Sequence, residues 1–598
     1  MRNITVKSSL ELTQSQKQTL EKGLKDRYGE DITIEYVIKD ILGGLIITDG
    51  EKLLDLSMSK DLLKIKKEAE RIINEMHAAS SAGAQLEKEL TPSDIPAFLK
   101  FNLGNIVTGN LDIDICGKVI DVADGIIRIS GLSSCKYNEL LLVNKDTYAI
   151  AMNLEKDRVG AMLLNNIDKV SFGDIVYATG KTAEVPVGQA LLGRVVNPLG
   201  QPLDGIRTLF TEKFRKIESP APSIVDREKV SRPLSTGILA IDSMVPIGKG
   251  QRELIIGDRQ TGKTSIAIDT IINQKGKNTL CVYVAIGQRA GEVAKIIRVL
   301  KENDAFEYTC MVVSAADDAP SLQYLAPYTG CAIAEEFMYD GKDVLIVYDD
   351  LSKHAVAYRT ISLLLKRPSG REAYPGDIFY IHSRLLERAA KLCKQKGGGS
   401  MTALPIIETL EGDISSYIPT NIISITDGQI YLERELFRSG VRPAVNVGLS
   451  VSRVGGAAQY PAIRKLSSKL RLTLAHYREL AVFSHFGSEL DDNTKRILEQ
   501  GEKIVEALKQ PQYQPMSVLR QTLILYLIAN QLISDVDKKH LGDFLTKFHH
   551  FYYSSYPAQA KELNSGRDLS DNAAATIEVA CEQFKAYYLA SLKKGGLP

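Results

Sequence analysis

The sequence predicts a multidomain α/β protein in four successive parts: a small α+β unit, a β-barrel, an α/β domain with a mostly parallel sheet, and a helical C-terminal domain. Three observations support this prediction. The chain has 598 residues, and one hydrophobic core rarely serves more than about 250–300 residues. The hydrophobic periodicity changes several times along the chain. A glycine-rich stretch, residues 257–264, separates an expected strand from an expected helix.

Composition excludes several classes of protein. Hydrophobic residues make up 44% of the chain and charged residues 25%, which is ordinary for a soluble globular protein. The formal net charge of +1 gives no overall electrostatic reason to bind nucleic acid or acidic lipid. No apolar run approaches the roughly 18–20 residues that span a bilayer, and the N-terminus lacks a signal-peptide core. The scattered cysteines, without a CxxC pair, indicate reduced thiols.

The first part, residues 1–80, is expected to form the α+β unit. Thr13 and Gln16 make a capping box for a helix. Residues 32–38 alternate like a strand, and glycine-containing turns on either side of residues 45–47 predict paired short strands. A basic amphipathic helix follows these strands.

The remaining boundaries follow changes in pattern. Residues 81–111 are expected to form a linker and a short helix. Short strands alternate with turns over residues 112–182, which is typical of a small β-barrel. Strand–helix alternation over residues 183–466 indicates the α/β domain. Residues 467–598 are almost wholly helical in pattern.

The glycine-rich stretch fits the phosphate-loop pattern, in which two glycines separated by four residues precede Lys and Thr. Between a strand and a helix, the loop amides and the helix N-terminus bind phosphates. Lys263 reaches the terminal phosphates and the Thr264 hydroxyl can ligate magnesium. A glycine-rich loop alone is more often a plain turn, but lysine, hydroxyl and context together predict nucleotide binding. The predicted phosphate-binding residues are Gly257, Asp258, Arg259, Gln260, Thr261, Gly262, Lys263 and Thr264.

Two other strands supply candidate polar groups beside this loop. Residues 342–350 read as an apolar strand ending in Asp349 and Asp350, and Asp349 is expected to hold magnesium through water. The alternative, a solvated strand end, is common for any single strand. Another strand leads to Gln288, where a hydrolytic site would place a carboxylate to orient water. Because Gln288 cannot act as a general base, we expect nucleotide binding with poor hydrolysis.

From about Thr91 to the C-terminus the sequence resembles the α subunits of F-type ATP synthases. The resemblance implies a barrel, a RecA-like nucleotide-binding domain and a helical domain, in this order. It also implies an α subunit that alternates with catalytic β subunits in a hetero-hexamer around a rotating γ shaft. The matching phrases are residues 257–265, 349–353, 370–376, 382–388, 417–421 and 450–455.

The resemblance also implies ATP or ADP and Mg²⁺ as ligands, and it assigns roles to further residues. Gln288 agrees with a noncatalytic pocket, because β subunits carry glutamate at the corresponding place. Arg453 corresponds to the arginine finger that α supplies to the β site, although an arginine after a strand is usually a surface or ion-pair residue. Ser450, in the same loop, resembles a position needed for activity. The residues that correspond to the surroundings of the adenine are Arg442, Pro443, Gln510 and Gln512.

Residues 1–80 depart from an α subunit and resemble the C-terminal half of the δ subunit, called OSCP in mitochondria. The alternative is an unrelated α+β extension. Because δ caps the ring by gripping the N-terminal segments of α, a fusion would make that contact intramolecular, at high effective concentration. The implied partners are the peripheral-stalk b subunit and the δ N-terminal half. The implied location is the cytoplasmic face of the bacterial membrane, reached only through partner subunits.

Three functions remain open at this point. The first is a regulatory subunit of a rotary ATP synthase, with hydrolysis completed on a partner chain. The second is a self-sufficient hexameric motor, such as an RNA translocase or a secretion ATPase, which Gln288 and the near-neutral charge oppose. The third is a ring-forming scaffold of another machine, which the intact phosphate loop and Arg453 disfavour.

Overall fold

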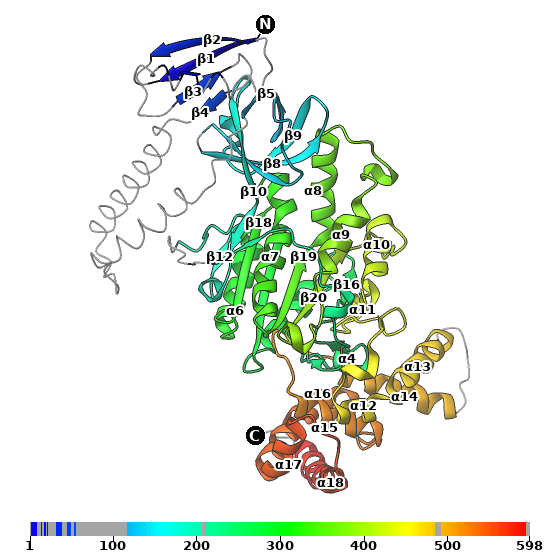
Figure 1. The fold of residues 1–598 in the computed structure, drawn as a ribbon. Coiled ribbons are helices and arrows are strands. Elements are labelled where there is room, and N and C mark those ends of the chain that lie inside the picture. Colours follow the sequence, from blue (N-terminus) through cyan, green and yellow to red (C-terminus); the bar gives the residue numbers. More distant parts are fainter. Residues whose placement is uncertain are drawn as a thin grey trace, which may run out of the picture. The chain divides into compact units, whose positions relative to one another are not determined.

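The chain divides into two compact units, Met1–Ala183 and Glu184–Pro598 (Figure 1). A computed structural model describes the protein over most of its length. The described residues are 2–8, 14, 17–18, 21, 32–38, 45–48, 53–55, 116–144, 146–205, 211, 213–484 and 492–593.

The first unit begins with a four-stranded sheet in the order β2-β1-β3-β4. Strand β1 pairs parallel with β2 and antiparallel with β3, which in turn pairs antiparallel with β4. The strand predicted at residues 32–38 and the paired short strands are confirmed. Strand β1 is missing from the sequence prediction, because its alternation rests on only two apolar side chains, Ile4 and Val6, which are both buried. The strands are β1 (Arg2–Ser8), β2 (Ile32–Ile38), β3 (Leu45–Thr48) and β4 (Leu53–Asp55).

Other predictions for this region fall largely on residues that the structure leaves undescribed. The single described positions Gln14, Lys17, Gln18 and Glu21 are all helical, in agreement with a helix there. The capping pair Thr13 and Gln16, the amphipathic helix after the sheet, and residues 81–111 lie outside the described residues.

A closed barrel follows in the same unit, in the order β10-β5-β6-β9-β8-β7. Its antiparallel strands enclose a core that includes Val119, Ile129 and Leu141. The predicted barrel is confirmed. The sequence pattern predicts its other strands but not β8, whose alanine and asparagine residues have low β-propensity. The strands are β5 (Cys116–Ala123), β6 (Ile126–Ser130), β7 (Glu139–Val143), β8 (Thr147–Leu154), β9 (Arg158–Leu163) and β10 (Ile175–Thr182).

The second unit is built on an eight-stranded sheet in the order β12-β18-β17-β19-β20-β16-β21-β22. Its strands pair in parallel apart from the last, because β22 runs antiparallel to β21. The strands are β12 (Val195–Val196), β16 (Leu254–Gly257), β17 (Thr279–Gln288), β18 (Thr309–Ala315), β19 (Asp343–Asp349), β20 (Ser400–Glu408), β21 (Gly428–Leu432) and β22 (Val451–Ser452). Two short two-stranded sheets accompany it, made by β11 (Glu184–Pro186) with β13 (Phe214–Lys216) and β14 (Pro233–Leu234) with β15 (Ile247–Gly248).

Helices cover both faces of this sheet, which explains why its central strands are buried along nearly their whole length. Tyr283 and Leu345 belong to the core that also holds residues of α5 and α6. Val284 faces the other way, toward Gly330 of α7, where an added Cβ would lie 2.3 Å from its methyl group. The helices are α4 (Leu239–Met244), α5 (Lys263–Ile272), α6 (Ala290–Glu302), α7 (Pro320–Tyr339), α8 (Leu351–Leu364), α9 (Ile378–Leu386), α10 (Tyr417–Ile425) and α11 (Arg434–Arg438).

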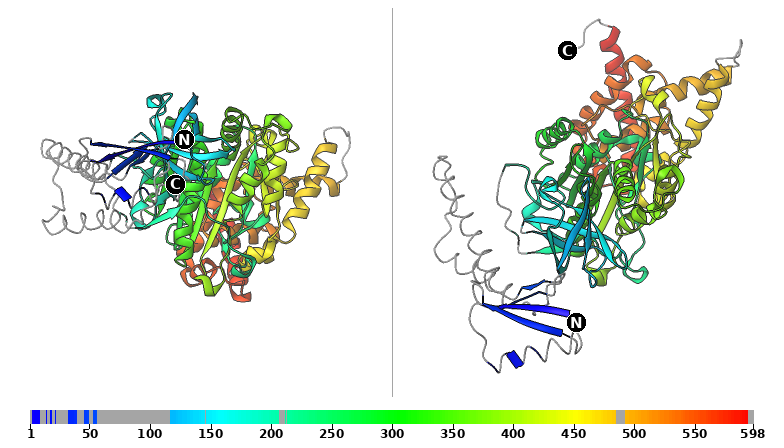
Figure 2. Two further views of the ribbon diagram at one scale, coloured as in Figure 1. Left: turned by 45° about the horizontal axis from the view of Figure 1, so that its top comes forward. Right: turned by 90° about the horizontal axis from the view of Figure 1, so that it is seen from above.

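The last part of the second unit is helical, as the sequence predicts. Phe544 and Phe548 of α16 pack against Phe584 and Tyr588 of α18. Figure 2 shows the gold α13–α14 pair projecting from the rest of this unit. The helices are α12 (Pro461–Ser467), α13 (Leu470–Ser484), α14 (Asp492–Ala507), α15 (Val518–Ala529), α16 (Lys538–Ser555), α17 (Pro557–Asn564) and α18 (Asp571–Lys593).

A buried ion pair joins α7 to the chain that follows α9. Arg388 donates from Nε and Nη2 to the two carboxylate oxygens of Glu335, at 2.7 and 2.8 Å. Its Nη1 donates to the carbonyl of Ile217 at 2.8 Å. Both charged side chains are 1% exposed. These hydrogen bonds, with a second pairing of Glu335 to Arg215 at 3.3 Å, offset the cost of burying the charges.

Membrane crossing finds no support in these elements. Among the described residues, none of the helices is both long enough and apolar enough to span a bilayer.

Candidate functional site

The predicted phosphate loop lies between β16 and α5, as expected. Gly262 precedes the first residue of α5 and has a φ of 97°, a left-handed conformation that favours glycine. Gly257 is required for a different reason, because an added Cβ would lie 2.5 Å from the carbonyl oxygen of Leu432 in β21. The two glycines therefore set the loop's turn and its packing against the sheet. A Cβ at Gly262 would meet nothing within 4 Å, so the loop surface is open at the start of the helix.

Lys263 lies with its ammonium group folded against this loop. Its Nζ donates to the carbonyl oxygens of Gly257 and Asp258, at 2.8 and 2.6 Å. The residue is 7% exposed, and burial lowers the pKa of the Lys263 ammonium, although the nearby carboxylates of Glu408 and Asp350 oppose this shift. A cation so confined suits an anionic group bound to the loop.

The side chains of Asp258 and Arg259 hold the loop to its neighbours. Asp258 Oδ1 accepts hydrogen bonds from Thr409 Oγ1 at 2.7 Å and from the Gly412 amide at 2.8 Å. Arg259 pairs with Glu408 at 3.0 Å, and Thr261 Oγ1 donates to the Asp258 carbonyl at 2.8 Å. These residues therefore support the loop's shape through their side chains.

Thr264 and Asp349, the predicted magnesium residues, are in direct contact. Thr264 Oγ1 donates to Asp349 Oδ2 at 2.7 Å, and the Tyr283 hydroxyl donates to the same oxygen at 2.6 Å. Gln288 Nε2 donates to Asp349 Oδ1 at 3.1 Å. Burial raises the pKa of the Asp349 carboxyl, and the Tyr283 and Thr264 hydrogen bonds oppose that shift. The predicted residues from separate strands and α5 thus meet at one carboxylate.

Asp350, the second carboxylate of the pair, has a structural task. Its Oδ1 accepts from the Lys353 amide at 2.9 Å and caps α8, which helps to fix the helix N-terminus. Burial, followed by the neighbouring charge of Asp349, raises the pKa of Asp350 to about 7. Among the described residues, no group of three or more His, Cys, Asp or Glu side chains could hold a metal ion. The Thr264–Asp349 pair fits instead a magnesium ion that shares its remaining ligands with phosphate and water.

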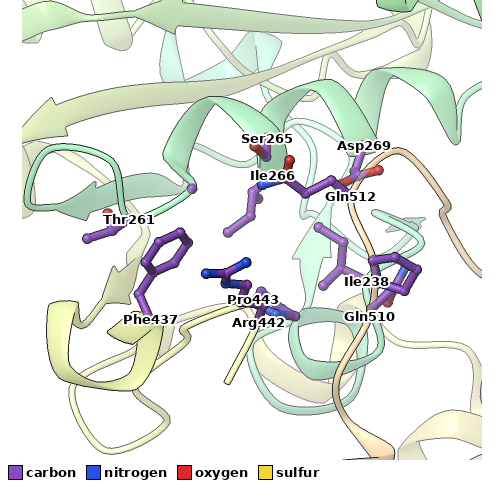
Figure 3. A pocket seen from close by; sticks show the side chains of 12 residues that line it. Ile238, Thr261, Ser265, Ile266, Asp269, Phe437, Arg442, Pro443, Gln510 and Gln512 are labelled. Atoms are coloured by element: carbon purple, nitrogen blue, oxygen red, sulfur yellow. The ribbon is translucent and has the colours of Figure 1, made fainter. Parts of the chain in front are cut away.

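Beside the loop lies a pocket (Figure 3) that collects all four residues assigned to the adenine. They come from distant parts of the chain and meet the start of α5 there. The Arg442 guanidinium lies over the Phe437 ring, 4.4 Å from its centroid. The pocket is lined by Ile238, Thr261, Gly262, Ser265, Ile266, Asp269, Phe437, Arg442, Pro443, Gln510, Pro511 and Gln512.

Several of these lining residues are absent from the sequence prediction. Ile238 and Phe437 carry no local signal, because an apolar residue before or within a short helix is ordinary core. Asp269 does carry one. It is the charged residue of the mainly apolar helical stretch of residues 266–272, and such a residue is rarely buried without a partner.

Ser450 and Arg453 lie apart from this pocket, at the edge strand β22. Ser450 is fully buried, where its Oγ donates to the Asn446 carbonyl at 2.6 Å and accepts from the Tyr431 amide at 2.9 Å. Arg453 has an exposed side chain, and its amide donates to the Asp427 carbonyl at 2.8 Å. Buried Ser450 therefore fixes the loop, while Arg453 extends from it into solvent.

Family models match the chain in four places. The nucleotide-binding domain of the ATP synthase alpha/beta family matches residues 237–452, and the C-terminal domain of the alpha/beta chain matches residues 459–584. The beta-barrel domain of the same family matches residues 113–180. The ATP synthase delta (OSCP) subunit matches residues 1–69, so the predicted likeness to δ is confirmed.

Whole proteins agree with these matches. The ATP synthase subunit alpha of Acetivibrio thermocellus is 58% identical over 503 residues, which are 84% of this chain and 99% of that protein. The ATP synthase subunits alpha of Clostridium acetobutylicum and Caldanaerobacter subterraneus subsp. tengcongensis are each 54% identical, again over 84% of this chain and over 99% and 100% of those proteins.

Proposed function

This chain belongs to the α subunits of F-type ATP synthases and carries a delta (OSCP)-like domain at its N-terminus, and from that premise we propose that it is the noncatalytic, regulatory subunit of the complex. It binds ATP or ADP with Mg²⁺ in its own pocket. Hydrolysis and synthesis take place on the partner β subunit, with which it alternates in a hetero-hexamer.

Gln288 is the observation that carries the noncatalytic assignment. Its amide donates to the side chain of Asp349, beside the site expected for magnesium. A carboxylate there would accept a proton from the attacking water, whereas a carboxamide is not basic at neutral pH. The neighbouring carboxylate of Asp350 is engaged in capping α8. The pocket therefore holds nucleotide without a group that activates water.

The binding roles follow from the geometry of the site. The loop amides of residues 257–264 and the Lys263 ammonium hold the phosphates, and Thr264 with Asp349 orients the magnesium ion. Bound magnesium would neutralise phosphate charge. Arg442, Pro443, Gln510 and Gln512 surround the base.

Arg453 has its role in the neighbouring subunit. It is exposed beyond the edge strand β22 and does not line the pocket of its own chain, and a guanidinium offered in trans stabilises charge in the transition state of phosphoryl transfer. Ser450 is a positioning residue, because its two hydrogen bonds tie the loop to β21 and to Asn446.

The purified full-length chain alone is expected to bind MgATP and to hydrolyse it negligibly, because Gln288 cannot polarise water. Lys263→Ala should abolish tight binding, since the terminal phosphates lose their cationic partner. Equilibrium dialysis and a steady-state ATPase assay, with and without RNA, measure both properties. Robust hydrolysis that survives a control for β contamination would overturn the noncatalytic assignment, and stimulation by RNA would favour a self-sufficient motor.

The N-terminal domain is proposed to tether the ring to the stator. A δ-like domain fused to α would present itself at the crown of the ring, where the peripheral-stalk b subunit and a δ N-terminal half would bind it. The γ shaft would turn inside the ring. The chain would then be peripheral on the cytoplasmic face of the bacterial membrane, held there by its partners.

Deleting residues 1–80 is therefore expected to leave an α–β ring that assembles and hydrolyses ATP, while attachment of the peripheral stalk is lost. The reason is that the barrel has a core of its own and that the nucleotide-binding sheet and the helical part share a second core. Native mass spectrometry of the reconstituted ring, with ATPase and proton-pumping assays, checks this. A truncated chain that fails to form rings would show that the segment belongs to the ring itself.

A further inference from the structure

The polar groups of the nucleotide pocket are not equally free to contact a base. Gln510, which the family likeness places beside the adenine, is already engaged. Its Nε2 donates to the carbonyls of Gly237 and Gln514, at 2.9 and 2.8 Å, and its Oε1 accepts from the Leu239 amide at 3.3 Å. Both amide hydrogens are thus used within the chain. Gln510 holds the pocket's wall together and has no donor left for a ligand.

Asp269 is in the opposite situation. It lies on α5 and lines the pocket (Figure 3), yet it is only 6% exposed. Its Oδ1 is buried and has no hydrogen-bond partner. Among the described side chains that line this pocket, Asp269 Oδ1 is the one buried polar atom without a hydrogen-bond partner. Leaving a buried acceptor unpaired costs free energy, so this oxygen has reason to meet a donor that arrives with the ligand.

The surroundings of Asp269 determine whether its carboxyl group donates or accepts a hydrogen bond. The backbone N–H groups of Tyr513 and Gln514 face its carboxylate and favour the ionised form, while burial raises the pKa of Asp269 to about 7. Tyr513 has a φ of 62°, which turns the chain around the carboxylate. Backbone donors therefore face the carboxylate, while its Oδ1 is buried at the pocket wall without a hydrogen-bond donor from the chain.

We propose that Asp269 selects the base of the bound nucleotide, with Oδ1 accepting a hydrogen bond from the 6-amino group of adenine. A purine with a 6-oxo group would present an acceptor to this acceptor and would be disfavoured. This inference rests on the proposed nucleotide site. It assigns base selection to Asp269 rather than to Gln510.

Asp269→Asn gives the sharpest test, because it is isosteric. The amide oxygen of the new side chain would face the N–H groups of Tyr513 and Gln514, which leaves its NH₂ group toward the pocket. The substitution thus turns an acceptor into a donor, and the preference should move from 6-amino to 6-oxo purines.

The experiment measures equilibrium binding of three nucleotides to the full-length chain by calorimetry at pH 8.5, above the pKa of Asp269. The nucleotides are MgATP, the magnesium complex of purine riboside triphosphate, which lacks the 6-amino group, and MgITP, which has a 6-oxo group. The unaltered chain should prefer MgATP over both by about 10–100-fold, since hydrogen bonds to charged groups contribute on this scale. Asp269→Asn should reduce the preference over purine riboside triphosphate to within about threefold and bind MgITP at least as well as MgATP.

Two control variants distinguish a wrong nucleotide site from a wrong role for Asp269. Lys263→Ala should weaken all three nucleotides alike, and unchanged binding in that variant would mean that the proposed site itself is wrong. Arg567→Ala changes an exposed residue outside the pocket lining and should leave the preference for the 6-amino group in place. If the unaltered chain binds MgATP and purine riboside triphosphate equally, or if Asp269→Asn keeps the original preference, Asp269 does not select the base. The first of these comparisons needs no variant, so it holds even if Asp269→Asn fails to fold.

Discussion

Replacing Arg453 with alanine is expected to lower ATP hydrolysis by the assembled complex by about 10³–10⁵-fold, the range for arginine fingers in phosphoryl transfer. The arginine lies on an exposed loop beyond β22, so it can meet nucleotide on a neighbouring subunit. An arginine finger contributes in the transition state, so the MgATP affinity of the isolated chain should change little. Lysine at the same position should rescue poorly, because an ammonium lacks the planar fork of a guanidinium.

The measurement pairs steady-state ATPase of the reconstituted complex with MgATP binding to the isolated variant. Arg567→Ala is a matched control, since this arginine is also exposed and lies in the turn between α17 and α18; it should leave turnover near normal. Near-normal turnover in Arg453→Ala would remove the finger role from this residue, whereas loss of MgATP binding would move Arg453 into the chain's own pocket.

Replacing Arg388 with methionine should destabilise the nucleotide-binding domain by about 3–5 kcal/mol, because it leaves the Glu335 carboxylate buried without its bidentate partner. At roughly 2–4 °C per kcal/mol for a domain of this size, the Tm should fall by about 6–20 °C. The remaining partner, Arg215, lies 3.3 Å from Glu335 and limits the loss toward the lower end of that range. Scanning calorimetry of the purified chain measures the change.

The double variant Arg388→Met with Glu335→Leu distinguishes a lost ion pair from lost packing. Replacing both partners with apolar residues removes the uncompensated charge, and such exchanges are often close to neutral. Most of the single variant's Tm loss should therefore be recovered. A double variant that is as unstable as Arg388→Met would show that the arginine acts mainly by filling space.

The strands around the phosphate loop could be predicted because they are buried on both faces. Such strands read as unbroken apolar runs, and the runs that build this site end at Gly257, Gln288 and Asp349. The barrel strand β8 escaped prediction because alanine and asparagine do not signal a strand, and its burial comes from the barrel's closure.

Sequence patterns alone could not predict which residues form the nucleotide pocket. Its walls come from Ile238, the residue before α4, from α5, from the segment around Arg442 and from the turn at Gln510. No periodicity connects positions so far apart, and only the likeness to a family assigned four of them. That likeness could not reveal that Gln510 is held by Gly237, Leu239 and Gln514, since hydrogen bonds between distant segments exist only in the folded chain. Asp269 is a charge in a mainly apolar stretch of α5, yet the sequence pattern assigns it no role.

The two outer strands of the eight-stranded sheet, β12 and β22, are each only two residues long. Unpaired strand edges invite other chains to add strands to them, and very short edges are one way that proteins avoid this. The sheets of neighbouring subunits in the proposed ring would otherwise risk joining into one continuous sheet. With edges this short, neighbouring subunits can meet through side chains alone, and an interface made of side chains can open and close without breaking backbone ladders. In the proposed ring, the short edges would therefore keep the sheet of this chain from joining those of its neighbours.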